Sequence, residues 1–484
     1  MTLLKSTAPQ FVAIEVVSDS HYGAVPVHNI IREDSSTAVP KTHPTQPRRK
    51  MVIKAGVIGT LVLLVAVAAL TSAQRSPVYD MVVEEGYSLV AAPPSQIHLS
   101  LWDDTKNRSV VESEGDPDAM VRLGMTVSWM TKTKTRSSIV RFGQTTETMT
   151  QTARSAEPCS QYTFCDYASP WLHHVTIPGD ELLPGTQYYL LSTISQTEFS
   201  EQTLRHLSKL ESMNAILHAG DLSYADSEQY RWDRWGRLVE PLASRMPWMV
   251  AAGNHEIEHT CLPEEDPFVA YQKRFLMPFD SSSDLQRRNL YYGFRVGMVH
   301  VVVLTPYIDS TPTSVQYQWL HEELARVDRT VTPWLVVIMH GPWYNSNVAH
   351  QNHEPHMIMK THMEDLLFQY QVDLVVAGHV HAYERSYPVY KEEIRDDGIV
   401  YVVLGDAGNR EGLAPSYIDP KPEWSAFRQA DYGYGMLSVL NRTHATLEWY
   451  EDRAEGEAER RDHVVLTTSQ FREQSDDSEE MHTA

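Results

Sequence analysis

Cysteine is scarce in this chain of 484 residues, which contains only Cys159, Cys165 and Cys261. Three cysteines are too few for a disulfide framework or for a zinc module made of paired CxxC motifs. Any metal must therefore be bound through nitrogen and oxygen atoms, and the 22 histidines offer nitrogen. Cys159 and Cys165 are close enough in sequence to pair in an oxidising compartment, which would leave Cys261 unpaired.

Positive charge is also in short supply. The chain has 41 Lys and Arg against 63 Asp and Glu, which gives a formal net charge of −22. Such an acidic chain is poorly suited to nucleic acid, so we expect no nucleic-acid partner. Hydrophobic residues at 42% and charged residues at 21% are ordinary for a globular protein and exclude a wholly disordered or fibrous chain.

Charge is absent from residues 55–73, which read AGVIGTLVLLVAVAALTSA. A helix of this length, at about 1.5 Å per residue, is about long enough to cross the hydrocarbon core of a bilayer. The segment predicts a transmembrane signal anchor, and a buried core helix is the alternative because it would also be apolar. Basic residues gather on its N-terminal side, at Arg48, Arg49, Lys50 and Lys54.

This charge asymmetry predicts a single-pass type II membrane protein. Residues 1–54 would form a cytosolic tail, and everything beyond residue 73 would be lumenal or extracellular. The sequons at Asn107 and Asn441 would then be sites of N-glycosylation. Cleavage near Ala73 is the alternative, and it would release a secreted protein.

Residues 93–194 show the alternation of short β-strands. Apolar and polar residues alternate around Ile97 and Leu99 and again around Val127 and Trp129, which predicts an all-β sandwich. Residues 183–189, LPGTQYY, are similar to the start of the penultimate strand of fibronectin type III modules, where a tyrosine marks the corner. The resemblance implies a fibronectin-III-like domain.

Residues 195–450 show a different pattern, which predicts an α/β domain of layered sheets covered by helices. Leu204, Leu207 and Leu210 have helical spacing, whereas later apolar runs are typical of buried strands. These runs occupy residues 215–219, 248–252, 299–304, 335–339, 373–377 and 399–404. Beyond them, residues 451–484 form an acidic tail that we expect to be solvated and disordered.

Four of the apolar runs are followed directly by side chains that can bind metal. Open α/β sheets place ligand sites at such strand ends. The candidates are Asp221, Tyr224, Asn254, His255, His340, His379 and His381. Oxygen and nitrogen atoms of this kind suit Fe, Zn or Mn, and a carboxylate can bridge two ions about 3.5 to 4 Å apart. A pair of ions of this kind binds a phosphoryl group and activates water.

The order and spacing of these motifs resemble the calcineurin-like metallophosphoesterases. Tyr224, the preceding sandwich and the segments PWYNSN, WSAFR and NRTHA resemble the purple acid phosphatases in particular. The resemblance extends from about Pro93 to Tyr450. It implies an acid phosphatase that hydrolyses phosphate monoesters with Fe(III) and a divalent metal, Zn, Fe or Mn.

The resemblance also implies a role for each candidate. Asp221 would bridge the two ions, with Tyr224 and His381 on the ferric ion. The divalent ion would be held by Asn254, His340 and His379. Outside the ligands, His255 and His350 match the histidines that hold the phosphate and assist the leaving oxygen. A surface position in a histidine-dense loop is the alternative for His350.

The chain departs from the family pattern at its first motif, Gly-Asp-x-Gly. Thr193 stands where that pattern places a carboxylate ligand of the ferric ion, and Glu198 is a poor substitute because it lies at the start of a helix. Only about ten residues precede that helix after Tyr189, too few for both the last sandwich strand and the first α/β strand. We predict that a stretch of roughly 30 residues is missing.

This departure leaves other functions open. One alternative is a catalytically impaired, membrane-anchored pseudoenzyme that binds one metal or phosphate. Another is a phosphodiesterase of the same superfamily. The sequence does not indicate the natural substrate or the oligomeric state.

Overall fold

The computed structural model describes residues 13–17, 25–26, 94–103, 123–143, 151–178, 187–210, 213–259, 267–279, 289–351, 353–453, 456–469 and 471. The predicted anchor at residues 55–73, Asn107, Cys261 and residues 454–455, 470 and 472–484 of the acidic tail lie outside these ranges. Among the helices of the described ranges, none has the length and apolar character to cross a membrane.

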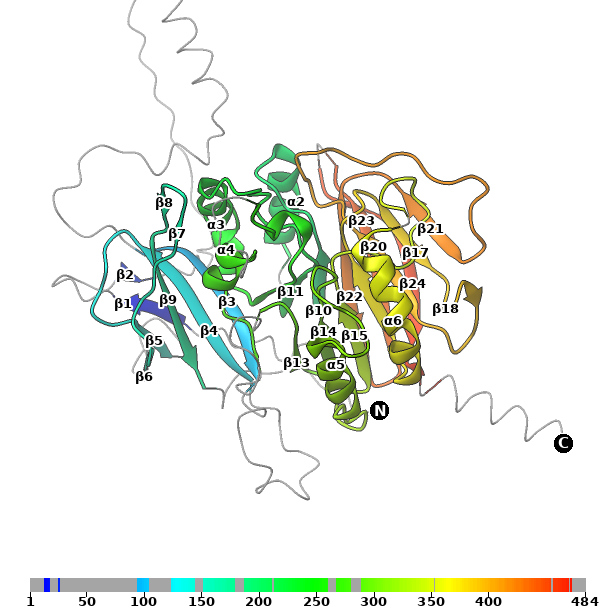
Figure 1. Cartoon of the computed structure of the whole chain (residues 1–484), viewed down its shortest axis with the longest axis horizontal. Helices are drawn as coiled ribbons and strands as arrows, with labels where there is room; N and C mark the ends of the chain where they lie inside the picture. Colours follow the sequence, from blue (N-terminus) through cyan, green and yellow to red (C-terminus); the bar gives the residue numbers. More distant parts are fainter. Residues whose placement is uncertain are drawn as a thin grey trace, which may run out of the picture. The chain divides into compact units, whose positions relative to one another are not determined.

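The N-terminal part of the fold consists of two facing antiparallel sheets (Figure 1). One contains β3 (Ser95–Asp103), β4 (Leu123–Thr131) and β9 (Trp171–Ile177), in the order β3-β4-β9. The other has the order β2-β1-β5-β6, with β1 (Ala13–Val17), β2 (Val25–Pro26), β5 (Ile139–Gly143) and β6 (Gln151–Arg154). The core between the two sheets is centred on Val127, Trp129, Val140 and Val175. The all-β domain is therefore present, and its likeness to fibronectin type III modules stays a prediction.

The strand β1 bears on the predicted membrane topology. Ala13–Val17 pairs with the whole of β5, from Gly143 back to Ile139. A strand that pairs with β5 must lie on the same side of a membrane as the sandwich. This pairing and a cytosolic tail at residues 1–54 therefore exclude each other.

The predicted pairing of Cys159 with Cys165 is wrong. Cys159 is a free, buried thiol whose Sγ lies 3.5 Å from the carbonyl oxygen of Thr135. Cys165 instead takes part in a disulfide. It lies in the turn between β7 (Thr163–Phe164) and β8 (Tyr167–Ala168), which pair as a short antiparallel hairpin.

The α/β domain contains a six-stranded and a seven-stranded sheet. The six-stranded sheet has the order β12-β11-β10-β22-β23-β24: Trp248–Val250, Ala215–His218, Gln187–Leu191, Gly433–Val439, His444–Glu451 and Glu459–Thr467. The seven-stranded sheet has the order β13-β14-β15-β16-β20-β17-β21: Tyr292–Val296, Val299–Val303, Trp334–Ile338, Leu374–Ala377, Val400–Leu404, Tyr383–Ser386 and Ser425–Gln429. The six predicted strands are thus confirmed. A small hairpin adds β18 (Val389–Tyr390) and β19 (Glu393–Ile394).

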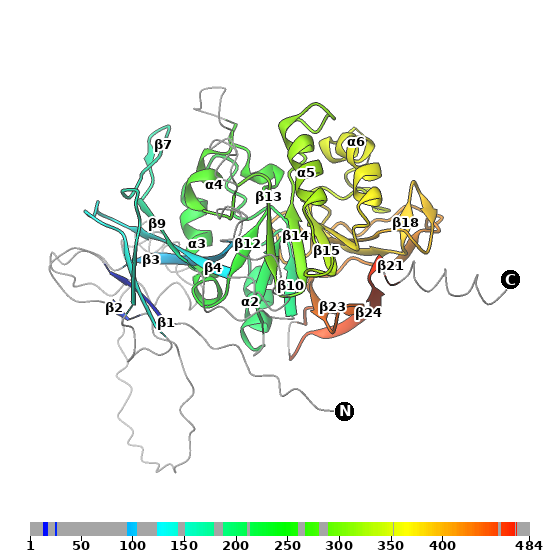
Figure 2. The same cartoon turned by 90° about the horizontal axis from the view of Figure 1, so that it is seen from below.

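Helices cover the outer faces of the two sheets, as predicted. In Figure 2, α5 (Val315–Ala325) and α6 (Pro355–Gln369) lie on one side of the domain, whereas α2 (Glu198–Ser208) lies on the opposite side. Helix α2 is capped by Thr197, whose hydroxyl accepts the N–H of Ser200, and it buries Leu204 and Leu207. The described ranges also contain α3 (Tyr230–Ala243), α4 (Val269–Arg274) and the short 3-10 turn η4 (Asn254–Glu256).

The junction between the domains differs from the prediction. Residues 187–191 form β10, which pairs in parallel with β11 and antiparallel with β22. This stretch is therefore the first strand of the α/β domain and not a corner of the sandwich, and the boundary at residues 194 and 195 is wrong. A strand paired on both sides gains two ladders of hydrogen bonds, which a place at the sandwich edge would not give.

The prediction of a disordered tail from residue 451 onward is also wrong in part. Strand β24 pairs with β23 from Thr467 to Glu459 and completes the edge of the six-stranded sheet. Its many charged residues are typical of an edge strand, which charge protects from pairing with other chains. Charge alone was thus a poor guide to disorder here.

Candidate metal centre

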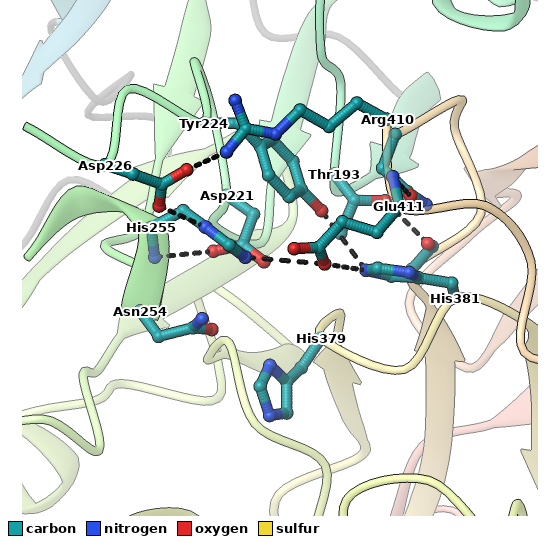
Figure 3. A network of polar contacts seen from close by, with 12 residues as sticks. Thr193, Asp221, Tyr224, Asp226, Asn254, His255, His379, His381, Arg410 and Glu411 are labelled. Carbon is teal, nitrogen blue, oxygen red and sulfur yellow. Dashed lines mark hydrogen bonds and ion pairs between the residues drawn. The ribbon is translucent and has the colours of Figure 1, made fainter. Parts of the chain in front are cut away.

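The predicted ligands follow strands of both sheets and lie close together in one cluster. Asp221 and Tyr224 follow β11, Asn254 and His255 follow β12, His340 follows β15, and His379 and His381 follow β16. These strands are parallel within their sheets, so their carboxyl ends lie together. Figure 3 shows part of this cluster, with Asp221, Tyr224, Asn254, His255, His379 and His381.

One half of the cluster has the spacing of a metal site. His340 Nε2 lies 2.9 Å from Asp221 Oδ2, 3.1 Å from Asn254 Oδ1 and 3.2 Å from His379 Nδ1. Ligand atoms around one ion with bonds of about 2.1 Å lie about 3 Å apart. Asp221 Oδ2 is buried and has no hydrogen-bond partner among the described residues. An orphaned carboxylate oxygen among nitrogen donors suits a divalent transition metal.

The two imidazoles of this half are oriented as neutral ligands. His340 Nδ1 lies 2.8 Å from the carbonyl oxygen of Ala219, so it carries the proton and leaves Nε2 free. His379 Nε2 lies 3.3 Å from a carboxylate oxygen of Glu354, so the other ring nitrogen, Nδ1, faces the cluster. Burial lowers the pKa of His379 to about 3. The ring is therefore able to bind metal at acid pH.

The backbone is strained around these ligands. Asp221, Tyr224 and His379 have φ angles of 55°, 49° and 66°, in the left-handed region that non-glycine residues seldom adopt. At Gly220, with φ of 89°, a Cβ atom would lie 2.5 Å from Nδ1 of His340. Strain of this kind gathers at functional sites because the surrounding structure must maintain it.

Glu256 holds the loops of the site together, and no sequence pattern points to it beyond its position after His255. Its carboxylate accepts the N–H groups of Asp221 at 2.9 Å, Leu222 at 2.9 Å and Gly253 at 2.8 Å. Burial, together with the charge of Asp221, raises the pKa of Glu256 to about 7. For Asp221 burial acts in the same direction, but the neighbouring His340, His255 and His379 hold its pKa well below the usual range. Asp221 is therefore the ionised partner of the two.

The other half of the cluster contains Tyr224 and His381. Tyr224 Oη lies 3.2 Å from His381 Nε2, and His381 Nδ1 lies 2.9 Å from the carbonyl oxygen of Gly412. Thr193 follows β10 at the edge of this half, and it is fully buried. Its hydroxyl donates to the carbonyl oxygen of Gly405 at 2.6 Å. No carboxylate follows β10 within residues 187–197, and Glu198 is exposed on α2.

His255 and His350 lie beside the ligands. His255 Nδ1 is 2.5 Å from Asp226 Oδ1, and its ring packs against that of Tyr224. His350 Nδ1 is 3.0 Å from Glu354 Oε1, and the centres of the His350 and His379 rings are 3.8 Å apart. The structure thus brings all eight predicted residues together. It adds Asp226, Glu354, Arg410 and Glu411, which are loop residues without a strand pattern to point to them.

Three family models match the chain. Calcineurin-like phosphoesterase matches residues 175–383, Iron/zinc purple acid phosphatase-like protein C matches residues 398–460, and Purple acid Phosphatase, N-terminal domain, matches residues 116–201. The structure of purple acid phosphatase PPD1 from yellow lupin seeds has a similar fold. It gives a TM-score of 0.63 at 20% identity, covering 77% of this chain and 74% of the lupin chain.

Curated relatives of similar length share more of the sequence. Probable purple acid phosphatase 20 of Arabidopsis thaliana is 37% identical over 444 residues, which cover 86% of this chain and 98% of the relative. Fe(3+)-Zn(2+) purple acid phosphatase 12 of the same plant is 34% identical, over 72% of this chain and 83% of the relative. The metallophosphoesterase fold and the preceding purple acid phosphatase domain are therefore confirmed, and the chain belongs to the purple acid phosphatase family.

Proposed function

We propose that the protein hydrolyses phosphate monoesters at a binuclear centre that holds a ferric ion and a divalent ion, Zn, Fe or Mn. The cluster of Asp221, Asn254, His340 and His379 supports this most directly, because its ligand atoms are already spaced about an ion. The iron and zinc in the name of the Arabidopsis relative support the choice of metals. Neither alternative, the pseudoenzyme or the phosphodiesterase, gains support from the relatives.

The two ions, when bound, would neutralise the phosphate oxygens and lower the pKa of a water molecule that attacks phosphorus. His255 would bind the phosphate on one side. Burial alone would lower its pKa, but hydrogen bonding to Glu411 and the charge of Asp221 raise it above the usual value. The ring is then a cation at acid pH and attracts an anion. His350, half-exposed beside His379, would stabilise the leaving oxygen.

We further propose that activity is reduced by a gap at the domain junction. The N-terminal family model reaches residue 201 although the phosphoesterase model begins at residue 175, so two domains share residues 175–201. The alignment with the Arabidopsis relative is 444 residues long, which exceeds 86% of this chain. The relative therefore has residues that have no counterpart in this chain. Their number is close to the roughly 30 residues that we expect the junction to lack.

The catalytic domain would lie outside the cytosol, since Cys165 takes part in a disulfide. In the type II arrangement, residues 55–73 would anchor the protein, and β1 would have to leave the sandwich. The alternative is a secreted protein, released by cleavage near Ala73. In both arrangements Asn441, which is exposed, would be a site of N-glycosylation. Protease protection of an N-terminal tag in microsomes distinguishes a cytosolic tail from a β1 strand that stays with the sandwich.

Metal analysis with absorption spectroscopy tests the proposed function. Purified protein loaded with iron and zinc should contain both metals and should be purple, because a tyrosinate bound to ferric iron absorbs visible light. The Tyr224→Phe variant should keep its fold and lose the colour. Colourless wild-type protein that contains iron would contradict the role of Tyr224, and protein without metal would contradict the function.

A further inference from the structure

The loop that follows β20 places a carboxylate in the half of the centre that contains Tyr224 and His381 (Figure 3). Glu411 Oε2 lies 3.8 Å from His381 Nε2 and 3.6 Å from His255 Nε2. His381 Nε2 in turn lies 3.2 Å from Tyr224 Oη. A negatively charged oxygen therefore faces the atoms that would hold the ferric ion.

The backbone of this loop is held firmly at the site. The side-chain oxygen of Asn409 accepts the N–H groups of Glu411 at 2.8 Å and of Gly412 at 2.9 Å. The carbonyl oxygen of Gly412 lies 2.9 Å from His381 Nδ1, so the same loop fixes the tautomer of His381. Asn409 therefore positions the backbone of Glu411, and the contact of Gly412 with His381 ties the same loop to the centre.

Other candidates for the missing carboxylate are already engaged. The Thr193 hydroxyl is neutral and donates to Gly405, the residue that begins this loop. The carboxylate of Asp226 forms an ion pair with Arg410 and contacts Nδ1 of His255, on the side away from His381. Glu411 is the carboxylate whose oxygen approaches both ring Nε2 atoms, of His255 and His381.

We propose that Glu411 supplies the ferric ion with the carboxylate that β10 does not provide. The inference rests on the proposed function. The separation of 3.8 Å from His381 Nε2 exceeds the spacing of ligands about one ion by about 1 Å. The Glu411 side chain is 47% exposed, so a small rotation closes the difference without disturbing packing. Its charge adds to that of Asp221 and tyrosinate in balancing a trivalent ion.

The Glu411→Gln variant tests this role, because it keeps the shape of the side chain and removes the charge. We expect the affinity for iron, measured by competition with a chelator, to fall at least tenfold. The divalent metal should be retained. The remaining ferric ion, with one anionic donor fewer, accepts charge from tyrosinate more easily. The visible band should therefore move to longer wavelength as well as lose intensity.

Asp226→Asn is the matched control, since Asp226 is the other carboxylate in contact with His255. It should retain iron and leave the visible band in place. If Glu411 acts only by holding His255, both variants should lower kcat/KM alike and keep iron, which would overturn the inference. The inference would also be overturned if wild type and Glu411→Gln bound iron with equal affinity. A wild-type protein that takes up no iron would instead overturn the proposed function.

Discussion

The two halves of the metal centre differ in how completely the chain builds them. The half around His340 has its four ligands, and three ligand atoms lie within 3.2 Å of His340 Nε2. The half around His381 has Tyr224 and the shared Asp221, and beside them lies Thr193, whose hydroxyl donates to the carbonyl oxygen of Gly405. The half around His340 takes no predicted ligand from β10, whereas Thr193 of the other half follows β10, the strand at the domain junction.

The same difference appears in the two domains. In the α/β domain, residues 187–191 form a strand between β11 and β22. In the sandwich, β1 from the N-terminal segment pairs with β5. We propose that Glu411 and β1 replace what the junction lacks, Glu411 as a ligand of the metal centre and β1 as a strand of the sandwich.

The largest expected effect comes from removing a ring from either half. His340→Ala should abolish binding of the divalent ion, and His381→Ala that of iron, because each ring supplies a bond and not core packing. Phosphatase activity should fall by more than about 100-fold in both variants, above the range known for outer-shell changes. Assays with p-nitrophenyl phosphate at about pH 5, together with metal analysis, measure this.

The exposed His353 provides the control, because it lies in the same histidine-dense loop as His350 and outside the cluster. His353→Ala should behave as wild type. If His381→Ala stays active while His340→Ala does not, the half around His381 contributes nothing to catalysis, and the protein works with one ion.

The half of the metal centre around His340 is also the half that the sequence predicted best. Asp221, Asn254, His340 and His379 each follow a buried strand directly, so strand prediction placed them. Glu256, Glu354 and Glu411 lie in turns whose course depends on tertiary contacts, and no periodicity points to them. Residues 187–191 were assigned to the wrong domain because an apolar strand suits either one, and only the pairing with β11 and β22 decides.

Restoring the junction should narrow the difference between the halves. Inserting a family-like segment that ends in Gly-Asp-x-Gly before Gln196 supplies both a carboxylate and the missing length. We expect kcat/KM to rise by about tenfold or more, within the range for ligand changes, and the yield of folded protein to rise because unpaired sheet edges promote aggregation. Equal rates per folded molecule in both chains would show that the gap does not matter.

A smaller effect is expected from Glu354, which contacts both His350 and His379 from outside the cluster. Its pKa is lowered to about 2, chiefly by the hydrogen bond with His379, with burial opposing. A lowered pKa stabilises the fold above the ordinary value of 4.5, and the effect disappears as the pH falls toward 2. Glu354→Gln should therefore lower the Tm of metal-free protein at pH 6 but not near pH 2.

Activity of Glu354→Gln should fall by about tenfold, because the His379 ring loses the partner that orients it. The exposed Glu393 offers a control of the same chemistry on a hairpin away from the centre. A Tm difference that is independent of pH would mean that the glutamine disturbs packing and that the charge of Glu354 is not what matters.

The smallest effect concerns β1. Deleting residues 1–27 removes a strand that pairs with β5 over five residues and leaves that edge open. The Tm should fall by a few degrees, as expected for the loss of about 1 kcal/mol in a domain of this size. Amide exchange in β5 should accelerate, whereas kcat/KM per folded molecule should not change, since no ligand lies in the sandwich. Deleting only residues 1–12 keeps β1 and is the matched control. Unchanged exchange in β5 after the longer deletion would mean that β1 leaves the sandwich, as a cytosolic tail requires, and that the sandwich tolerates the gap without replacing its strand.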